Sequence, residues 1–346
     1  MRSRAPGAGD TLPGALAGLP IAERGVTFRG GFEAAAECDL CGGRRQRARA
    51  VYTEYLLFRD ERFLLVTCED CGLHFLNPRP SPEIIGEYYP GDYAAHLEEP
   101  RPLRPWQIRA GGDGQPPLGP LARLRLHVRQ NMHWYKILPY ERGGRVLDIG
   151  CGAGKLLDTL KQLGWQTYGV EPSAAAVERA RARGHRVEVG RAEDRCFDES
   201  FDAVYLWHVL EHTHVPARVL ANVFDYLAPG GRFFLCVPNF KSLHARMFGR
   251  YWWSTDAPRH LYQFERGTLR RYLERAGFVD IQMTTRTGAS SWLRGFRHAI
   301  NGIFGTRLSR DPGWLLELCE IPVVASSLFR FFGVGSELRV ECRKPA

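Results

Sequence analysis

The chain has 346 residues, of which 44% are hydrophobic, and its formal net charge is +9 at pH 7. This length predicts one large domain with a smaller one, and the hydrophobic fraction is sufficient for a folded core. The positive charge favours acidic partners such as nucleic acid, anionic lipid or a phosphorylated metabolite, without choosing among them. Four of the nine cysteines lie in two C-x-x-C pairs, which disfavours a disulfide framework and favours a metal site in a reducing compartment. We therefore expect a cytoplasmic protein.

The N-terminal residues 1–20 are rich in glycine, alanine and proline and contain no apolar run long enough for a secretory signal. This composition predicts a disordered leader, which we extend over residues 1–30. Folded structure is expected to begin with the cysteine-bearing segment that follows.

That segment carries two turns of one design, Cys38-Asp-Leu-Cys41-Gly and Cys68-Glu-Asp-Cys71-Gly. A C-x-x-C turn followed by glycine points both thiolates at one ion, and two such turns complete a tetrahedral zinc site without an open position. Such a site is structural, because its binding energy helps to fold a segment too small to be stable alone. We therefore predict a zinc ribbon over residues 31–80. A redox C-x-x-C and a chance spacing are the alternatives.

Residues 81–140 are predicted to form a linker with lid helices. The prolines of residues 76–83 impose an extended path, and Ser81 followed by proline is typical of a helix start. The tyrosines of residues 88–93 are either core aromatics or part of a substrate-binding wall. Residues 121–138 have apolar side chains at helical spacing, which predicts a helix beside the large domain.

The stretch 145–155, RVLDIGCGAGK, combines a short apolar run with crowded glycines. The apolar run predicts a buried parallel strand, and leucines at helical spacing follow the glycines. Gly150, Gly152 and Gly154 let the backbone turn sharply and let a ligand approach the N-terminus of the helix. A dinucleotide-binding loop would have its last glycine at position 155, which is Lys155 here. We therefore predict a ligand-binding turn, with a packing turn or another nucleotide as the alternative.

From residue 145 onward, strand and helix patterns alternate, which predicts a parallel sheet with helices on both faces. The second strand ends at Glu171, about 20 residues beyond the glycine loop, where an acid is placed to bind ribose hydroxyls. The Pro-Gly-Gly of residues 229–231 predicts the turn into the fifth strand. The further expected elements are strands at 187–189, 201–206, 232–237 and 337–342, a helix capped by Ser173, and a helix over 265–277 capped weakly by Glu265 or by Thr268.

These segments resemble class I S-adenosylmethionine-dependent methyltransferases that carry an N-terminal zinc ribbon, and are similar to the ubiquinone-pathway O-methyltransferase group. The resemblance rests on VLDIGCGAG at the loop, GVEPS at the second strand, the Pro-Gly-Gly strand and the CxxCG…NPRPxPE…YYPxxY lead-in. It implies an α/β, doubly wound, Rossmann-like sheet of seven strands in a methyltransferase domain over residues 141–346, with a helical insertion at about 288–335. It also implies S-adenosylmethionine as the cofactor, bound by Asp148, Gly150, Cys151, Gly152, Gly154, Glu171, Pro172, Glu193, Asp194 and His208.

The segment after the fourth strand, His208-Val-Leu-Glu211-His212, matches the inverted zinc-protease motif, but that motif requires a helix rather than the end of a strand. The resemblance makes it the acceptor side of the site, with Glu211 and His212 facing the acceptor. After the fifth strand, where the family has PxHLxxF, this chain has His260. Either His212 or His260 suits a general base, because the unperturbed pKa of imidazole is about 6.5. Arg259 is expected to anchor an anionic acceptor, and a structural role is the alternative for each of these residues.

The expected reaction is methyl transfer to a small-molecule acceptor, most readily to oxygen, in secondary-metabolite, quinone-like or glycan biosynthesis. One alternative is an RNA methyltransferase that grips nucleic acid with the zinc ribbon, but no basic stacking platform is evident. A non-catalytic cofactor-binding protein is another. The insertion at 288–335 is too interrupted by charged residues and proline to span a bilayer. We expect it to form a cap over the active site or a peripheral membrane contact, and the oligomeric state does not follow from the sequence.

Overall fold

The computed structural model describes residues 14–54, 57, 59–89, 144–287, 289–306 and 333–346. The helix predicted over residues 121–138 and residues 307–332 of the predicted insertion lie outside the described residues. The chain divides into two compact units. The first unit comprises Met1–Gly91, His208–Ala221 and Leu235–Cys342, and the second comprises Asp92–Trp207, Asn222–Phe234 and Arg343–Ala346.

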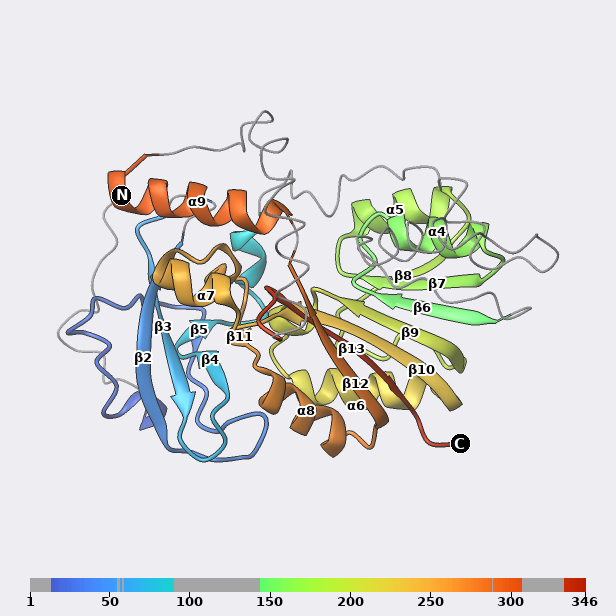
Figure 1. Cartoon of the computed structure of the whole chain (residues 1–346), viewed down its shortest axis with the longest axis horizontal. Coiled ribbons are helices and arrows are strands. Elements are labelled where there is room, and N and C mark those ends of the chain that lie inside the picture. The colour runs from blue at the N-terminus through green and yellow to red at the C-terminus, as the bar shows by residue number, and fades with distance from the viewer. Residues whose placement is uncertain (1–13, 55–56, 58, 90–143, 288, 307–332) are drawn as a thin grey trace. The chain divides into compact units, whose positions relative to one another are not determined.

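Seven strands form one sheet, in the order β12 (Val279–Arg286), β13 (Glu337–Arg343), β10 (Leu227–Pro238), β9 (Phe201–Trp207), β6 (Arg145–Ile149), β7 (Gln166–Glu171) and β8 (Arg186–Val189) (Figure 1). β6 pairs in parallel with both β7 and β9, and β7 pairs in parallel with β8. Val146, Leu147 and Ile149 are all buried, as expected for a parallel strand covered on both faces. This mostly parallel sheet confirms the expected α/β, Rossmann-like fold.

The described α-helices are α4 (Lys155–Gln162), α5 (Ala174–Ala182), α6 (Pro216–Tyr226), α7 (Leu243–Phe248), α8 (Arg266–Arg275) and α9 (Ala289–Phe304). Ser173 caps α5 as predicted, because its side chain accepts a hydrogen bond from the amide of Ala176. At α8 the amide of Glu265 donates to Thr268 Oγ1 at 3.2 Å, so both residues share a capping box. No helix within the described ranges is long and apolar enough to cross a membrane.

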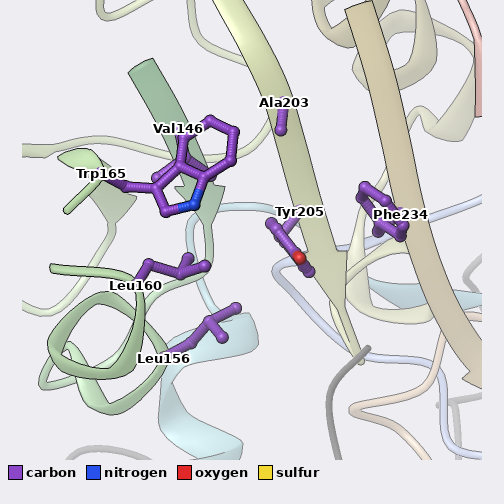
Figure 2. Packing of buried hydrophobic residues seen from close by; sticks show 7 residues of the cluster. All are labelled: Val146, Leu156, Leu160, Trp165, Ala203, Tyr205 and Phe234. Atoms are coloured by element: carbon purple, nitrogen blue, oxygen red, sulfur yellow. The ribbon is translucent and has the colours of Figure 1, made fainter. Parts of the chain in front are cut away.

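A buried apolar cluster in the second unit holds α4 against the sheet. Figure 2 shows Leu156 and Leu160 of α4 near Val146 of β6. On the neighbouring strands, Tyr205 and Phe234 stack with their ring centroids 4.9 Å apart. Leu156 and Leu160 are one helical turn apart, so both reach the same face of α4. Burying each such leucine contributes about 1.5–3 kcal/mol, and this packing fixes the helix that follows the glycine loop.

The first unit contains a four-stranded sheet, in the order β11 (Tyr262–Gln263), β4 (His74–Leu76), β3 (Arg62–Cys68) and β2 (Gln46–Thr53) (Figure 1). All its pairings are antiparallel. β2 and β3 form a hairpin between the two C-x-x-C turns. β11 follows far downstream, and its Tyr262 is the register partner of Phe75 in β4. A separate pair joins β1 (Phe32–Glu33) to β5 (Arg79–Pro80).

Residues 14–30, which the sequence placed in a disordered leader, are folded onto this part of the first unit. Leu16, Ile21 and Val26 are buried. The amide of Thr27 donates to the carbonyl of Arg62 at 2.8 Å, and the amide of Arg62 donates to Thr27 Oγ1 at 2.9 Å. These apolar side chains are too widely spaced to give a periodic pattern, so the sequence did not reveal their burial.

Two element boundaries also differ from the expectations. The Pro-Gly-Gly of residues 229–231 lies inside β10, which begins at Leu227, because the amide of Gly230 bonds to the carbonyl of Lys344. No helix begins at Ser81. Its carbonyl accepts hydrogen bonds from two amides of a turn, and a short 3₁₀ helix, η2 (Ile85–Tyr88), follows.

Candidate functional site

The glycine loop joins β6 to α4 within the second unit. Gly150, Gly152 and Gly154 have φ angles of 75°, 53° and 88°, in the left-handed region that glycine adopts without strain. Gly154 is also closely packed, because a Cβ atom there would lie 3.1 Å from Ala180 Cβ. The loop leads into the first turn of α4, whose amides have no partner inside the helix. This is the geometry of a turn that brings backbone N–H groups to an anionic or polar ligand.

Two buried acids lie at the ends of the strands beside the loop. Glu171 Oε2 accepts a hydrogen bond from the amide of Gly152 at 3.0 Å, and its Oε1 accepts one from the amide of Ser173 at 3.0 Å. Asp148 is 4% exposed. Burial and the charge of Glu171 raise the pKa of Asp148 to about 8. Glu171 therefore holds the loop in place, and the environment of Asp148 favours its protonated form.

The remaining residues expected at the cofactor have distinct environments. Cys151 is buried, and burial followed by the charges of Asp148 and Glu171 raises the pKa of its thiol well above the usual value. Pro172 is exposed directly after β7. In the turn after β8, the carboxylate of Asp194 accepts from the amide of Arg191 and the carbonyl of Glu193 accepts from Asn222. These side chains and the loop all belong to the second unit.

The four cysteines of the two C-x-x-C turns converge on one point in the first unit. The Sγ atoms of Cys38 and Cys71 are 3.5 Å apart, and those of Cys41 and Cys68 are 3.6 Å apart. All four sulfur atoms lie within 4.8 Å of one another. Four thiolates at about 2.3 Å from a tetrahedral zinc ion have sulfur atoms about 3.8 Å apart. The donor set and its dimensions therefore fit a zinc ion.

The cysteine turns also contact helices of the large sheet. Asp39, inside the first C-x-x-C, accepts a hydrogen bond from the amide of Ala217 at 2.9 Å and from the hydroxyl of Tyr272 at 2.8 Å. Arg275 of α8 donates to the carbonyl of Leu40. Asp39 of the cysteine-bearing segment thus provides the hydrogen-bond acceptor for a backbone amide in the first turn of α6.

Glu211, His212 and His260 form a second cluster in the first unit. Their ligand atoms lie within 4.8 Å of one another, and the two imidazole centroids are 4.5 Å apart. Glu211 is fully buried, and its Oε2 has no hydrogen-bond partner among the described residues. Burial and the neighbouring His260 lower the pKa of His212 to about 4. Two histidines that are distant in the sequence are therefore brought together around one carboxylate.

His208 belongs to the first unit, where it lies beside this cluster, whereas the glycine loop belongs to the second unit. It has a φ of 54°, and its Nδ1 is 3.2 Å from Glu211 Oε1. Its Nε2 lies 3.7 Å from both Cys236 Sγ and Glu337 Oε1. Burial lowers the pKa of His208, but Cys236, Glu211 and Glu337 outweigh it, so the pKa is raised well above its usual value. Sequence reasoning missed Cys236 and Glu337, and the only signal for them is their position near the ends of strands.

Arg259 does not have the role expected of it. Its guanidinium is 1% exposed and donates to Asp256, to Glu54 Oε1 at 2.9 Å and to the carbonyl of Tyr88 at 2.9 Å. A guanidinium with these partners has little capacity left for an anionic acceptor. The structural alternative holds for Arg259, because it links three separate segments of the first unit.

Tyr88 and Tyr89, which the sequence left open, divide between core and site, and Trp252 is a further core aromatic. Tyr88 and Trp252 are buried, and Tyr88 packs edge-on against Phe63 at 5.9 Å. Tyr89 is only partly buried, and its hydroxyl lies 3.0 Å from His212 Nδ1. Tyr88 and Trp252 are therefore core aromatics, and Tyr89 lies at the histidine cluster.

Comparisons with known proteins agree with the sheet and the loop. Residues 125–283 match the family described as Methyltransferase domain. The ubiquinone biosynthesis O-methyltransferase of Xanthomonas oryzae pv. oryzae is 35% identical over 107 residues, which are 28% of this chain and 44% of that protein. The enzyme of the same name from Mesorhizobium japonicum is 31% identical over 162 residues, 44% of this chain and 65% of that protein. The chain thus spans less than two thirds of the length of these relatives.

Among solved structures, a methyltransferase of Thermotoga maritima described as a possible histamine N-methyltransferase matches 60% of this chain and 84% of its own, with 23% identity and a TM-score of 0.41. The family match includes the glycine loop, the acids after β6 and β7 and the segment His208 to His212. Residues 125–283 thus match a methyltransferase domain, and the seven-stranded sheet is the Rossmann-like fold expected of class I S-adenosylmethionine-dependent methyltransferases.

Proposed function

We propose that the chain transfers a methyl group from S-adenosylmethionine to a hydroxyl oxygen of a small-molecule acceptor. The observation that supports this acceptor chemistry is the buried cluster of Glu211, His212 and His260. Methyl transfer from a sulfonium is an in-line displacement, so the protein must align the nucleophile and remove its proton. A hydroxyl acceptor needs this proton removal, and the relatives named ubiquinone biosynthesis O-methyltransferase are consistent with such an acceptor.

For the cofactor, we propose that the glycine loop and the acids beside it form the binding site. Glu171 accepts hydrogen bonds from the amides of Gly152 and Ser173, which hold its carboxylate at the carboxyl end of β7, where an acid is placed to bind ribose hydroxyls. The cofactor supplies the electrophilic methyl group. The proposed contacts in the second unit come from Asp148, Gly150, Cys151, Gly152, Gly154, Glu171, Pro172, Glu193 and Asp194, and a contact with His208 of the first unit stays an expectation from the sequence.

On the acceptor side, we propose that His260 takes the proton of the hydroxyl, with His212 and Glu211 beside it. His260 Nδ1 lies 2.7 Å from the carbonyl oxygen of Ser254. Because a carbonyl only accepts, Nδ1 carries the hydrogen, and Nε2 is left with the lone pair. Glu211 is close enough to stabilise the imidazolium that forms when Nε2 accepts a proton.

We propose that Cys38, Cys41, Cys68 and Cys71 hold one structural zinc ion within a ribbon over residues 31–80. The sulfur distances support this role, and four protein ligands leave no open position for a substrate. A cytoplasmic location follows from the same proposal, since thiolate ligands persist in a reducing compartment. The methyltransferase domain over 141–346 and the cap or membrane contact formed by 288–335 stay predictions.

The test is incorporation of the methyl group of labelled S-adenosylmethionine into a panel of phenols, catechols, small hydroxylated sugars and total RNA. We expect labelling of a hydroxylated small molecule. His260→Ala should lower turnover by about 100-fold or more, with unchanged affinity for S-adenosylhomocysteine, because general-base catalysis contributes about 10²–10⁴-fold. Glu188→Gln on β8, whose carboxylate forms an exposed ion pair with Arg181, is the control. Labelling of RNA would support the RNA methyltransferase instead, and cofactor binding without any labelled acceptor would support a non-catalytic binder.

A further inference from the structure

We infer that Glu211, His212 and His260 form a binding site for a divalent transition-metal cation, separate from the four cysteines. The three side chains offer ligand atoms within 4.8 Å of one another. Two imidazoles and one carboxylate are a common ligand set for first-row metals, and they leave coordination positions open for water or substrate. The four cysteines instead form a closed set of soft ligands.

Both imidazoles are held in the tautomer that metal binding requires. His212 Nδ1 lies 3.0 Å from the carbonyl oxygen of Arg259, and His260 Nδ1 lies 2.7 Å from that of Ser254. Carbonyl oxygens only accept, so each Nδ1 carries a hydrogen and each Nε2 has a free lone pair. Histidines that bind metals nearly always donate their other ring N–H to such an acceptor. Both histidines of the cluster therefore already have the outer hydrogen bond that orients a metal ligand.

The carboxylate of Glu211 is also oriented by a neighbouring side chain. Glu211 Oε1 lies 3.2 Å from His208 Nδ1, which orients the carboxyl group. Its Oε2 is buried and has no hydrogen-bond partner among the described residues. A buried carboxylate oxygen without a partner is unfavourable, since it has lost its hydration without gaining a hydrogen bond. A cation bound by this oxygen and by the two histidines would satisfy it.

The cation site follows from these ligands alone, whereas its role rests on the methyl transfer proposed above. A hydroxyl bound to the cation has a lowered pKa and releases its proton to solvent, which leaves an oxygen anion as the nucleophile. His212 and His260 would then act as ligands, and the cation would replace His260 in activating the acceptor.

The test is a titration of the full-length protein that holds one zinc per chain with Mn²⁺ and no acceptor, followed by the electron paramagnetic resonance signal of free Mn²⁺. Manganese prefers oxygen and imidazole ligands to thiolates, so the cysteine site does not compete. We expect one Mn²⁺ per chain. His208→Gln, which changes an outer partner, should weaken binding about 10–100-fold, and Glu211→Gln should weaken it at least as much. Glu188→Gln on β8, in the other unit, should bind as the wild type does.

Retention of one zinc per chain by elemental analysis shows that each variant keeps the fold of the cysteine-bearing unit. The inference is overturned if the wild type leaves the free Mn²⁺ signal unchanged, or if Glu211→Gln binds as tightly as the wild type. The role of the cation in activating the acceptor is overturned if chelator-treated protein methylates its acceptor at the full rate, a result that leaves the proposed function intact. Stoichiometric Mn²⁺ binding in a protein that methylates no acceptor supports the site and removes the proposed function.

Discussion

Glu171 joins the end of β7 to the glycine loop, and its replacement tests the proposed cofactor site. Its two oxygens accept hydrogen bonds from the amides of Gly152 and Ser173, each at 3.0 Å. A hydrogen bond to a charged group contributes roughly 1.5–3 kcal/mol. Glu171→Ala removes both bonds and leaves the buried amide of Gly152 without its acceptor, so the loop loses roughly 3–6 kcal/mol of stabilisation. Glu171→Gln retains one carbonyl acceptor and the side-chain volume, so it loses about half of that.

The assay is calorimetric titration with S-adenosylhomocysteine together with thermal unfolding of the unliganded protein. We expect Glu171→Gln to bind about tenfold more weakly than the wild type, because 1.4 kcal/mol corresponds to a factor of ten, and Glu171→Ala to bind more weakly still. Glu188→Gln, the same substitution on the adjacent strand β8, is the matched control. Its carboxylate forms an exposed ion pair with Arg181, which contributes little.

Unchanged affinity in Glu171→Gln would show that the carboxylate neither holds the loop nor contacts the ligand. Preferential binding of NAD by the wild type would refute the assignment of the cofactor itself. A loss of thermal stability without a loss of affinity would confine Glu171 to holding the loop.

Three further predictions concern other parts of the chain. Because burial raises the pKa of Asp148 to about 8, its ionisation opposes folding as pH rises from about 4 to about 8. Asp148→Asn should therefore increase the free energy of unfolding more near pH 8 than near pH 5, and a gain independent of pH would contradict this. Chelation should release one zinc per chain and make residues 31–80 sensitive to protease, and protection of that segment after zinc loss would exclude a structural site. Arg259→Met removes the guanidinium that pairs with the buried carboxylate of Glu54 and should lower the free energy of unfolding by about 3–5 kcal/mol, as measured by chemical denaturation. A loss below about 1 kcal/mol would show that the ion pair is not structurally important.

The glycine loop and most strands of the large sheet were predicted by the sequence alone, because each such element depends on residues that are close in the chain. The run from Arg145 to Lys155 encodes strand, turn and helix through apolar spacing over about one strand and two helical turns. The alternation of such patterns predicted the parallel sheet, and all of its predicted strands are present within one or two residues except the earlier start of β10. The four cysteines were likewise identified by short spacings.

Only the tertiary structure determined which residues contact the histidines of the site. Arg259 follows a proline and precedes His260, and nothing in that pattern indicates a pairing with Glu54, 205 residues earlier. Cys236 and Glu337 come from different strands and meet at His208. Such contacts depend on which strands become neighbours and in which register, and a short sequence pattern carries no information about either.

The same reason applies to the boundary between the predicted zinc ribbon and the predicted methyltransferase domain. The predicted zinc ribbon ended at residue 80, but β11, after the fifth strand of the large sheet, pairs with β4 through Tyr262 and Phe75. A two-residue strand has no periodicity of its own, and its identity as a strand comes only from its partner. The pairing of β11 with β4 closes a long loop of the chain. The entropy cost of closing this loop is small only when the rest of the fold already holds its two ends together. Local periodicity therefore determined the elements of this protein, and long-range pairing determined how its histidine cluster is assembled.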